Sequence, residues 1–231
     1  MIEIAQWDTE HFGIKVGSLI PDGNVSKETL DKEITSAKAE GYDLLYLKGC
    51  KLQEDCLSDR VILADEKVVY SLTKHTDDYH KCDKVVSYLN KELDVKLLTL
   101  ALQSGGHSRY YTDKNMPVSV YITLYQIWIK NSLNGSIATD VLVYLDGNEV
   151  LGLLTYKLND KKAVIGLVDV DNSSKGKGIG SKLMQTFLSV LPYGTKVEVA
   201  TQKSNSVACH YYEKNGFNID CITNIYHIWI K

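Results

Sequence analysis

A buried strand, a glycine-rich turn and a helix follow one another within residues 163–190, and this segment constrains the fold most. Residues 163–170 are largely apolar, which predicts a buried strand. The turn glycines are Gly176, Gly178 and Gly180. An apolar helical pattern then comprises Ile179, Leu183, Phe187 and Val190. A glycine turn at a helix N-terminus presents free N–H groups to one point, so the segment predicts a site for a phosphate-bearing cofactor.

Three cofactor sites compete for this turn. A P-loop requires a Gly-Lys pair followed by Ser or Thr, whereas here Gly180 is followed by Ser181 and then Lys182. A Rossmann turn requires a different glycine spacing and an acid at the tip of the next strand. Here the next strand ends in Val-Glu-Val-Ala, without an acid at its tip. The pyrophosphate arm of coenzyme A remains, and a glycine turn without a ligand is the alternative.

Two motifs resemble the signatures of the GNAT superfamily of acyl-CoA N-acyltransferases. Residues 175–180 are similar to its Q/R-x-x-G-x-G/A signature, with Lys175 at the first position in place of glutamine or arginine. Residues 205–217 resemble its N-x-x-A-x-x-x-Y-x-x-x-G-F signature at every fixed position. These positions are Asn205, Ala208, Tyr212, Gly216 and Phe217. Asn205 is also an expected helix N-cap, and residues 215–216 are an expected helix end.

The resemblance implies a fold and a set of site residues. The predicted class is α/β (α+β), a GNAT fold whose central, mixed sheet is splayed and flanked by helices. Coenzyme A would pair its pantetheine arm with the exposed edge of residues 166–170 and place its phosphates on the turn. The cofactor-binding residues implied are Leu167, Val168, Asp169, Val170, Lys175, Gly176, Lys177, Gly178, Ile179, Gly180, Ser181 and Asn205.

Tyr212 is the expected catalytic acid. The resemblance implies that Tyr212 lies near the thioester sulfur, where a phenol can donate a proton to the departing thiolate. A backbone N–H of the splayed strand would polarise the thioester carbonyl. The chain has 15 tyrosines, so a packing role is the alternative for any one of them.

A narrower resemblance covers nearly the whole chain. It is to bacterial acetyltransferases that modify the 4-amino group of a dTDP-4-amino-4,6-dideoxyhexose, with the dTDP-fucosamine branch the nearest. Its marks are residues 7–13, 108–110, 128–135, 201–202 and 228–229. It implies that residues 1–90 form a partial GNAT-like α/β unit that helps build the acceptor site, and that residues 91–231 form the acetyltransferase domain. It also suggests a homodimer, although no stretch specifies one.

Arg109 and Tyr110 are the expected substrate-binding residues. Arg109 lies in a glycine-rich stretch and could clamp an anionic acceptor such as a nucleotide diphosphate, or form a loop-anchoring salt bridge instead. His107 is more readily an exposed loop residue than a base, and Phe12 a packing residue. For the base, Asp169 and Glu198 both stay open. No Cys/His/Asp spacing indicates a metal site.

Composition excludes several classes of protein. The net charge is −3 and only two arginines occur, which disfavours nucleic-acid binding. No segment approaches the about 18 apolar residues of a membrane span. The N-terminus shows no signal peptide, and the five cysteines contain no C-x-x-C pair, so a cytoplasmic protein with free thiols is expected.

The remaining segments are predicted as follows. Strands are expected at 14–20 and 43–48, a helix at 27–40, a hairpin from 61–63 and 67–72, and a strand at 96–102. A loop is expected at 105–111, a helix at 119–133, a hairpin from 140–145 and 149–156, and strands at 196–200 and 224–231.

Three functions follow from these predictions. The first is acetyl transfer from acetyl-CoA to the amine of a nucleotide-linked amino sugar, by direct attack in a ternary complex. The second keeps the fold and changes the acceptor to a peptide, an antibiotic or a polyamine. The third is a non-catalytic acyl-CoA-binding module, against which an intact Tyr212 argues.

Overall fold

The computed structural model describes residues 1–230, whose strands form one mixed ten-stranded sheet in the order β1-β2-β3-β10-β4-β9-β8-β7-β6-β5. The strands are β1 (Glu3–Ile4), β2 (Val16–Leu19), β3 (Leu44–Lys48), β4 (Val61–Thr73), β5 (Val85–Ser87), β6 (Asp140–Asp146), β7 (Glu149–Asn159), β8 (Lys162–Val170), β9 (Lys196–Gln202) and β10 (Asn218–Trp229). The α/β class with helices flanking a mixed sheet is confirmed.

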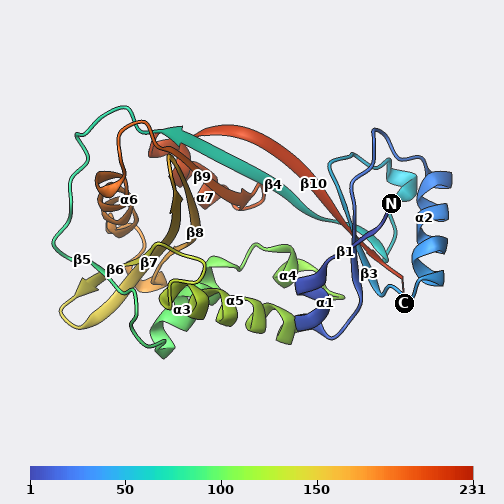
Figure 1. Cartoon of the computed structure of the whole chain (residues 1–231), viewed down its shortest axis with the longest axis horizontal. Helices are drawn as coiled ribbons and strands as arrows, with labels where there is room; N and C mark the ends of the chain where they lie inside the picture. Colours follow the sequence, from blue (N-terminus) through green and yellow to red (C-terminus); the bar gives the residue numbers. More distant parts are fainter. Residues whose placement is uncertain (231) are drawn as a thin grey trace.

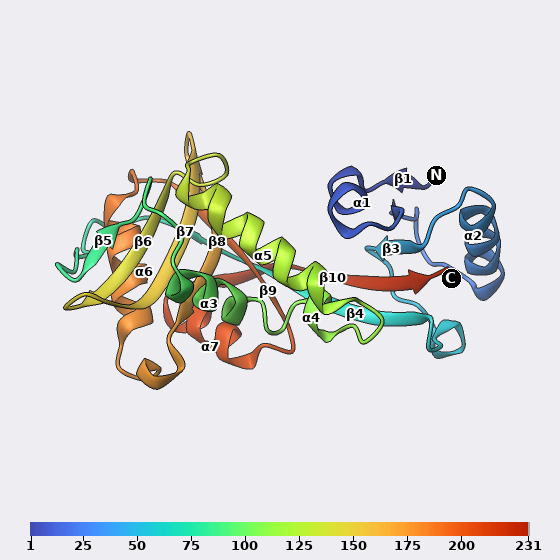
Figure 2. The ribbon, with the colours of Figure 1, turned by 90° about the horizontal axis from the view of Figure 1, so that it is seen from below.

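Helices cover both faces of the sheet, as Figures 1 and 2 show. They are α1 (Gln6–Phe12), α2 (Lys27–Ala39), α3 (Val95–Ser104), α4 (Arg109–Thr112), α5 (Val118–Leu133), α6 (Ile179–Val190) and α7 (Ser206–Lys214), with 3-10 turns η1 (Glu54–Cys56) and η2 (Asn172–Ser174). Adjacent residues of β7 show the two layers, because Leu153 packs with α3 and α5 whereas Leu154 packs with α6.

Two long strands join the halves of the molecule. β4 and β10 pair antiparallel along most of their length and run from the α2 end of the sheet to the α6 end (Figure 1). β10 also pairs with β3, and β4 with β9, so segments from both ends of the chain lie in the middle of the sheet. Any acceptor site in this central region therefore receives residues from both parts of the sequence.

The hairpin expected from residues 61–63 and 67–72 is wrong, because both segments belong to the single strand β4. Residues 64–66 contain no glycine that would favour a tight turn. Pairing with β10 instead satisfies their backbone. A bulge takes up one extra residue, since Ile225 faces Asp65 while the next residue, Tyr226, faces Leu63.

The strand expected at 96–102 is also wrong, since these residues form α3. The Asp94 side chain accepts a hydrogen bond from the Leu97 N–H at 2.8 Å and caps the helix. Leu97, Leu100 and Ala101 are buried at helical spacing, a period that the continuous apolar run concealed.

Three further expectations need adjustment. The loop expected at 105–111 ends in the short helix α4, which begins at Arg109. The last strand, expected at 224–231, begins earlier, at Asn218, because β4 is long enough to pair with the added residues. Lys231, its expected end, lies outside the described residues.

The sheet is splayed where the resemblance placed the cofactor. β8 and β9 pair in parallel only from Lys162 opposite Lys196 to Ile165 opposite Val199. Beyond that point β8 continues to pair with β7, and β9 continues to pair with β4. Residues 166–170 therefore leave one strand edge without a neighbouring strand.

Candidate functional site

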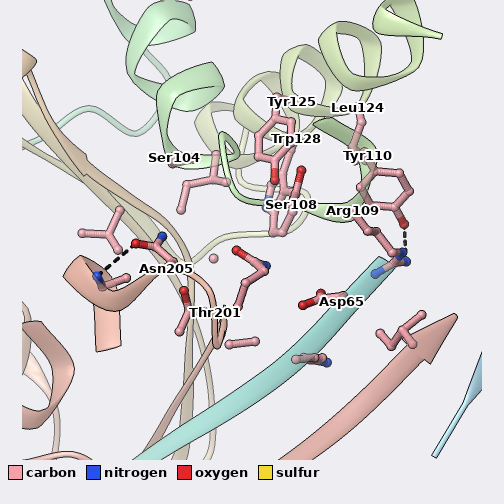
Figure 3. Close-up of a pocket in the computed structure, with 18 of the residues that line it drawn as sticks. Asp65, Ser104, Ser108, Arg109, Tyr110, Leu124, Tyr125, Trp128, Thr201 and Asn205 are labelled. Carbon is pink, nitrogen blue, oxygen red and sulfur yellow. Dashed lines mark hydrogen bonds between the residues drawn. The ribbon is translucent and has the colours of Figure 1, made fainter. Parts of the chain in front are cut away.

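A cavity of about 450 Å³ opens at the splay between β8 and β9. Figure 3 shows residues from both halves of the chain directed toward it. The lining residues are Lys48, Asp65, Lys67, Ser104, Ser108, Arg109, Tyr110, Leu124, Tyr125, Trp128, Gly166, Leu167, Val168, Ala200, Thr201, Gln202, Asn205, Ala208, Tyr212, Thr223 and Ile225. A volume of this size is typical of small-molecule sites.

A bulge in β8 forms one wall of the cavity. The register shifts by one residue between Tyr156 opposite Ile165 and Leu154 opposite Val168. Within the bulge, the Leu167 N–H donates to Thr155 Oγ1 at 2.9 Å. A Cβ on Gly166 would lie 2.7 Å from that same hydroxyl, so only glycine fits there. The bulge thus turns the free edge of β8 toward the cavity.

The turn after β8 has the geometry of an anion site. Gly178 is the N-cap of α6, and both Gly176 and Gly178 have positive φ, at 81° and 77°. The backbone N–H of Lys182 donates to the Gly178 carbonyl at 3.1 Å, so the N–H groups of residues 179–181 precede the first helical hydrogen bond. The turn therefore presents backbone donors at the positive end of a twelve-residue helix.

Lys175 and Asp169 link the turn to the end of β8. The Lys175 ammonium lies 3.5 Å from Asp169 Oδ1, which also accepts from the Val170 N–H at 2.8 Å. Burial raises the pKa of Asp169, and Lys175 acts in the opposite direction. Asp169, Val170 and residues 175–181 lie outside the lining of the cavity, along the direction in which β8 leaves it.

Gly180 brings the two signature helices together. Its carbonyl accepts a hydrogen bond from the Tyr211 hydroxyl at 2.7 Å, and a Cβ on it would lie 3.2 Å from the Tyr211 ring. The close approach of α6 and α7 explains why glycine occupies this position.

Asn205 and Tyr212 of the second signature both reach the cavity. Asn205 caps α7, since its Oδ1 accepts from the Ala208 N–H at 3.1 Å, as expected. Tyr212 lies two turns along and is only 3% exposed. Burial raises its pKa well above the ordinary range, so its phenol stays protonated at neutral pH and can act as a proton donor.

Arg109 and Tyr110 lie together at the opposite end of the cavity. The Arg109 guanidinium donates to the Tyr110 hydroxyl and lies 5.0 Å above the Tyr46 ring. Its Nε is buried and has no hydrogen-bond partner among the described residues. Lys48 also lines this region, and burial together with Arg109 lowers the pKa of Lys48. The arrangement favours an anionic group on the ligand.

The other sequence candidates lie outside the cavity lining. Glu198 forms ion pairs with Lys162 at 2.8 Å and Lys196 at 3.1 Å, and hydrogen bonds from both lysines lower its pKa. His107 is exposed. Phe12 packs edge-on against Tyr110, with the ring centroids 5.7 Å apart.

Sequence reasoning missed three charged residues that line the cavity, namely Lys48, Asp65 and Lys67. Lys48 ends a predicted strand and carried no motif. The other two lay in the incorrectly predicted hairpin, so their common face could not be recognised. Two positions apart on one strand, they point to the same side.

Within residues 1–230, His, Cys, Asp and Glu side chains form no group of three or more that could hold a metal ion. No helix in this part of the chain combines the length and apolarity needed to cross a bilayer.

Comparison with protein families agrees with the motifs. Residues 107–217 match the Acetyltransferase (GNAT) family. The spore coat polysaccharide biosynthesis protein SpsD of Bacillus subtilis (strain 168) is 31% identical over 133 residues, which cover 56% of this chain. The match spans only 45% of the length of that relative.

Several solved structures share the fold. A conserved protein of unknown function from Staphylococcus epidermidis superimposes with a TM-score of 0.64 at 13% identity, covering 94% of this chain and 84% of its own. A putative GNAT acetyltransferase from Novosphingobium aromaticivorans superimposes with a TM-score of 0.52 at 13% identity, covering 85% of this chain and 80% of its own. A tandem GNAT protein from the clavulanic acid biosynthesis pathway superimposes with a TM-score of 0.53 at 13% identity, covering 89% of this chain and 70% of its own.

Proposed function

We propose, from the premise that this chain contains a GNAT acetyltransferase domain, that it transfers acetyl from acetyl-CoA to the amino group of a nucleotide-linked amino sugar. The general reaction of the family is acyl transfer from acetyl-CoA. One observation carries the proposal for this chain. A single cavity joins the free edge of β8 to a cationic end at Arg109.

Acetyl-CoA would occupy the β8 side of the splay. Its pantetheine amides would pair with the free edge of residues 166–170, in the manner of an added strand. Its pyrophosphate would accept hydrogen bonds from the N–H groups of residues 179–181, which precede the first helical hydrogen bond of α6. Lys175 and Lys177 add positive charge beside that turn. In this proposal, the cofactor would follow the free edge of β8 from the cavity to the glycine turn, and Asn205 would meet it from α7.

The amino sugar would occupy the other end. Arg109 offers a planar cation to a diphosphate, and Tyr110 holds that cation in place. Lys48 and Lys67 add positive charge on the same side. They come from residues 1–90, which supports a role for that unit in acceptor binding. The name of the Bacillus subtilis relative, a spore coat polysaccharide biosynthesis protein, supports a sugar acceptor.

In the proposed reaction the amine attacks the thioester directly, without an acyl-enzyme. Tyr212 donates its phenolic proton to the departing thiolate, which restores a neutral thiol. A backbone N–H at the bulge of β8 polarises the thioester carbonyl.

Thiol release from acetyl-CoA with a panel of amines tests this function. The panel contains dTDP-4-amino-4,6-dideoxyhexoses of both C4 configurations, spermidine and a peptide amine. Release with one nucleotide sugar alone would support the acceptor class. Release with spermidine or the peptide would redirect the acceptor. Acetyl-CoA binding without turnover on any amine would favour a non-catalytic module.

We also propose that the protein works in the cytoplasm, because all five of its cysteines are free thiols. A homodimer rests on the family resemblance alone. Sedimentation analysis of the purified chain would measure its oligomeric state directly.

A further inference from the structure

Asp65 is a buried carboxylate in the wall of the cavity. It is 6% exposed, and its Oδ1 has no hydrogen-bond partner within residues 1–230. Leaving a buried polar atom unpaired costs free energy, and such atoms require an explanation. Figure 3 shows the Asp65 side chain directed from β4 into the space between that strand and Thr201.

The bulge in β4 places this carboxylate. Ala64 is the extra residue between Leu63 and Asp65 in the pairing with β10. Beyond it, Val68 and Tyr70 pack in the core on the α6 side, so Asp65 faces the other way, toward α4. Without the extra residue Ala64, the side chains on one side of this point would face the opposite side of the sheet.

Tyr212 approaches the same cavity from the opposite face of the sheet. It belongs to the core cluster beneath α6, which also contains Tyr70. Asp65, by contrast, interacts with Arg109 of α4. Both line the cavity because β8 and β9 separate there and open a passage between the faces. An acid and a carboxylate thus flank one gap.

The charges around Asp65 keep the carboxylate available near neutral pH. Burial raises the pKa of Asp65 to about 6, while Arg109 of α4 and Lys67 of β4 act to lower it. Glu66 of β4 acts in the raising direction, and Tyr125 of α5 also interacts with the Asp65 charge. A base with such a pKa is ionised at pH 7 and can still hold a proton transiently.

We propose that Asp65 is the general base that removes a proton from the acceptor amine. This inference rests on the proposed acetyl transfer. The two carboxylates favoured by the sequence fit the role less well. Glu198 is neutralised by two lysines, and Asp169 lies beside the phosphate turn. Neither lines the cavity.

Asp65 Oδ1 takes one proton from the ammonium of the acceptor, and the freed nitrogen lone pair forms a bond to the thioester carbonyl carbon. The carbon–sulfur bond breaks as Tyr212 gives its proton to sulfur. The second excess proton on nitrogen returns through water to the Tyr212 phenolate, and Asp65 releases its proton to solvent. The net products are an amide, a thiol and one proton.

The test compares Asp65→Asn and Asp65→Glu with the wild type, using the amine that the panel identifies. We expect Asp65→Asn to lower kcat at pH 7 by about 100-fold or more, within the usual range for general bases. Its acetyl-CoA Kd should stay within about twofold, because Asp65 faces the acceptor side. Asp65→Glu should recover part of the activity, since it retains a carboxylate.

The pH profile separates a base from a merely structural residue. Wild-type kcat should fall on the acidic side with a midpoint near the pKa of about 6 that burial gives Asp65, and Asp65→Asn should lose this limb. A wild-type profile without an acidic limb between pH 5 and 7 would overturn the proposal even if the variants failed to fold. So would an Asp65→Asn variant with kcat within about threefold of wild type.

Two control variants locate any effect. Glu66→Gln changes the adjacent residue, whose side chain forms a surface ion pair with Lys203 at 3.0 Å, and should leave kcat within about twofold. A large loss in Glu198→Gln instead would assign the base to Glu198. Inactivity of the wild type on every amine would refute the acetyl transfer itself, a result distinct from an active wild type with an unaffected Asp65→Asn.

Discussion

Ile165 of β8 lies opposite Val199 of β9, and this pair is the last at which the two parallel strands are joined. One residue later, Gly166 enters the bulge of β8, and the strand edge becomes free. The cavity begins where this pairing ends, and it contains Tyr212 on one side and Asp65 on the other. The features proposed for both substrates therefore depend on the geometry at a single point of the sheet.

Gly166→Ala should damage this point. The added Cβ would lie 2.7 Å from Thr155 Oγ1 and 3.3 Å from Trp128 Nε1, so the bulge must shift. We expect a loss of about 1–3 kcal/mol in the free energy of unfolding and weaker acetyl-CoA binding. Urea denaturation and calorimetric titration measure the two effects. Gly106→Ala, where the nearest atom is 3.4 Å away, is the matched control, and equal effects in both variants would contradict the prediction.

Tyr212→Phe should lower kcat by roughly 100-fold or more with acetyl-CoA affinity nearly unchanged, because only the proposed proton donor is lost. The ring contacts with Tyr70 and Phe217 remain, so the fold should persist. Steady-state thiol release and acetyl-CoA titration give the two numbers. Turnover equal to the wild type would remove Tyr212 from the mechanism.

Arg109→Gln should raise the KM for a nucleotide-linked acceptor by about 10-fold or more while leaving the acetyl-CoA Kd unchanged. The reason is that a charge-assisted clamp on the diphosphate is lost, which is worth about 1.5–3 kcal/mol. Arg60, the other arginine of the chain, is exposed, so Arg60→Gln provides the control. An acceptor KM that does not respond to Arg109→Gln would assign Arg109 a structural role.

Asp65→Asn should stabilise the protein at pH 7. The folded pKa of Asp65, raised by burial to about 6, exceeds the ordinary value of 3.8, so the native state holds this proton more tightly than the unfolded chain. Stability attributable to Asp65 is therefore lost as pH rises from about 4 to 6. Asp65→Asn avoids that loss, so its free energy of unfolding at pH 7 should exceed that of the wild type by up to roughly 3 kcal/mol. Urea melts at pH 4 and pH 7.5 should show a gap that grows with pH, and a constant gap would contradict this.

Asp113→Ala should destabilise the protein by about 2–4 kcal/mol. The Asp113 carboxylate accepts hydrogen bonds from buried His227 at 2.6 Å and from Trp229 at 3.0 Å, and joins the end of α4 to β10. Its loss would leave both ring N–H groups unpaired in the interior. Asp94→Ala removes only a helix cap and should cost about 1 kcal/mol. Chemical denaturation of both variants compares them, and equal losses would mean that the buried contacts are replaced by water.

The sequence by itself determined the elements in which local pattern and chemistry agree. The strand, turn and helix of residues 163–190 follow from an apolar run, three glycines and helical spacing. Asn205 was predictable as a cap because capping depends on residues three positions apart. The motif spacing also indicated the family to which residues 107–217 are matched. For these segments, the local free energies and the tertiary contacts favour the same structure.

The tertiary structure alone decided what depends on distant partners. Residues 61–73 became one strand because β10 pairs with them, although β10 lies about 150 residues further along the chain. Residues 95–104 became a helix because the sheet buries one side of α3. The position of Asp65 depends on a bulge set by register with β10, and register between distant strands leaves no local signal in the sequence. The acceptor side of the cavity could therefore be found only once the sheet was assembled.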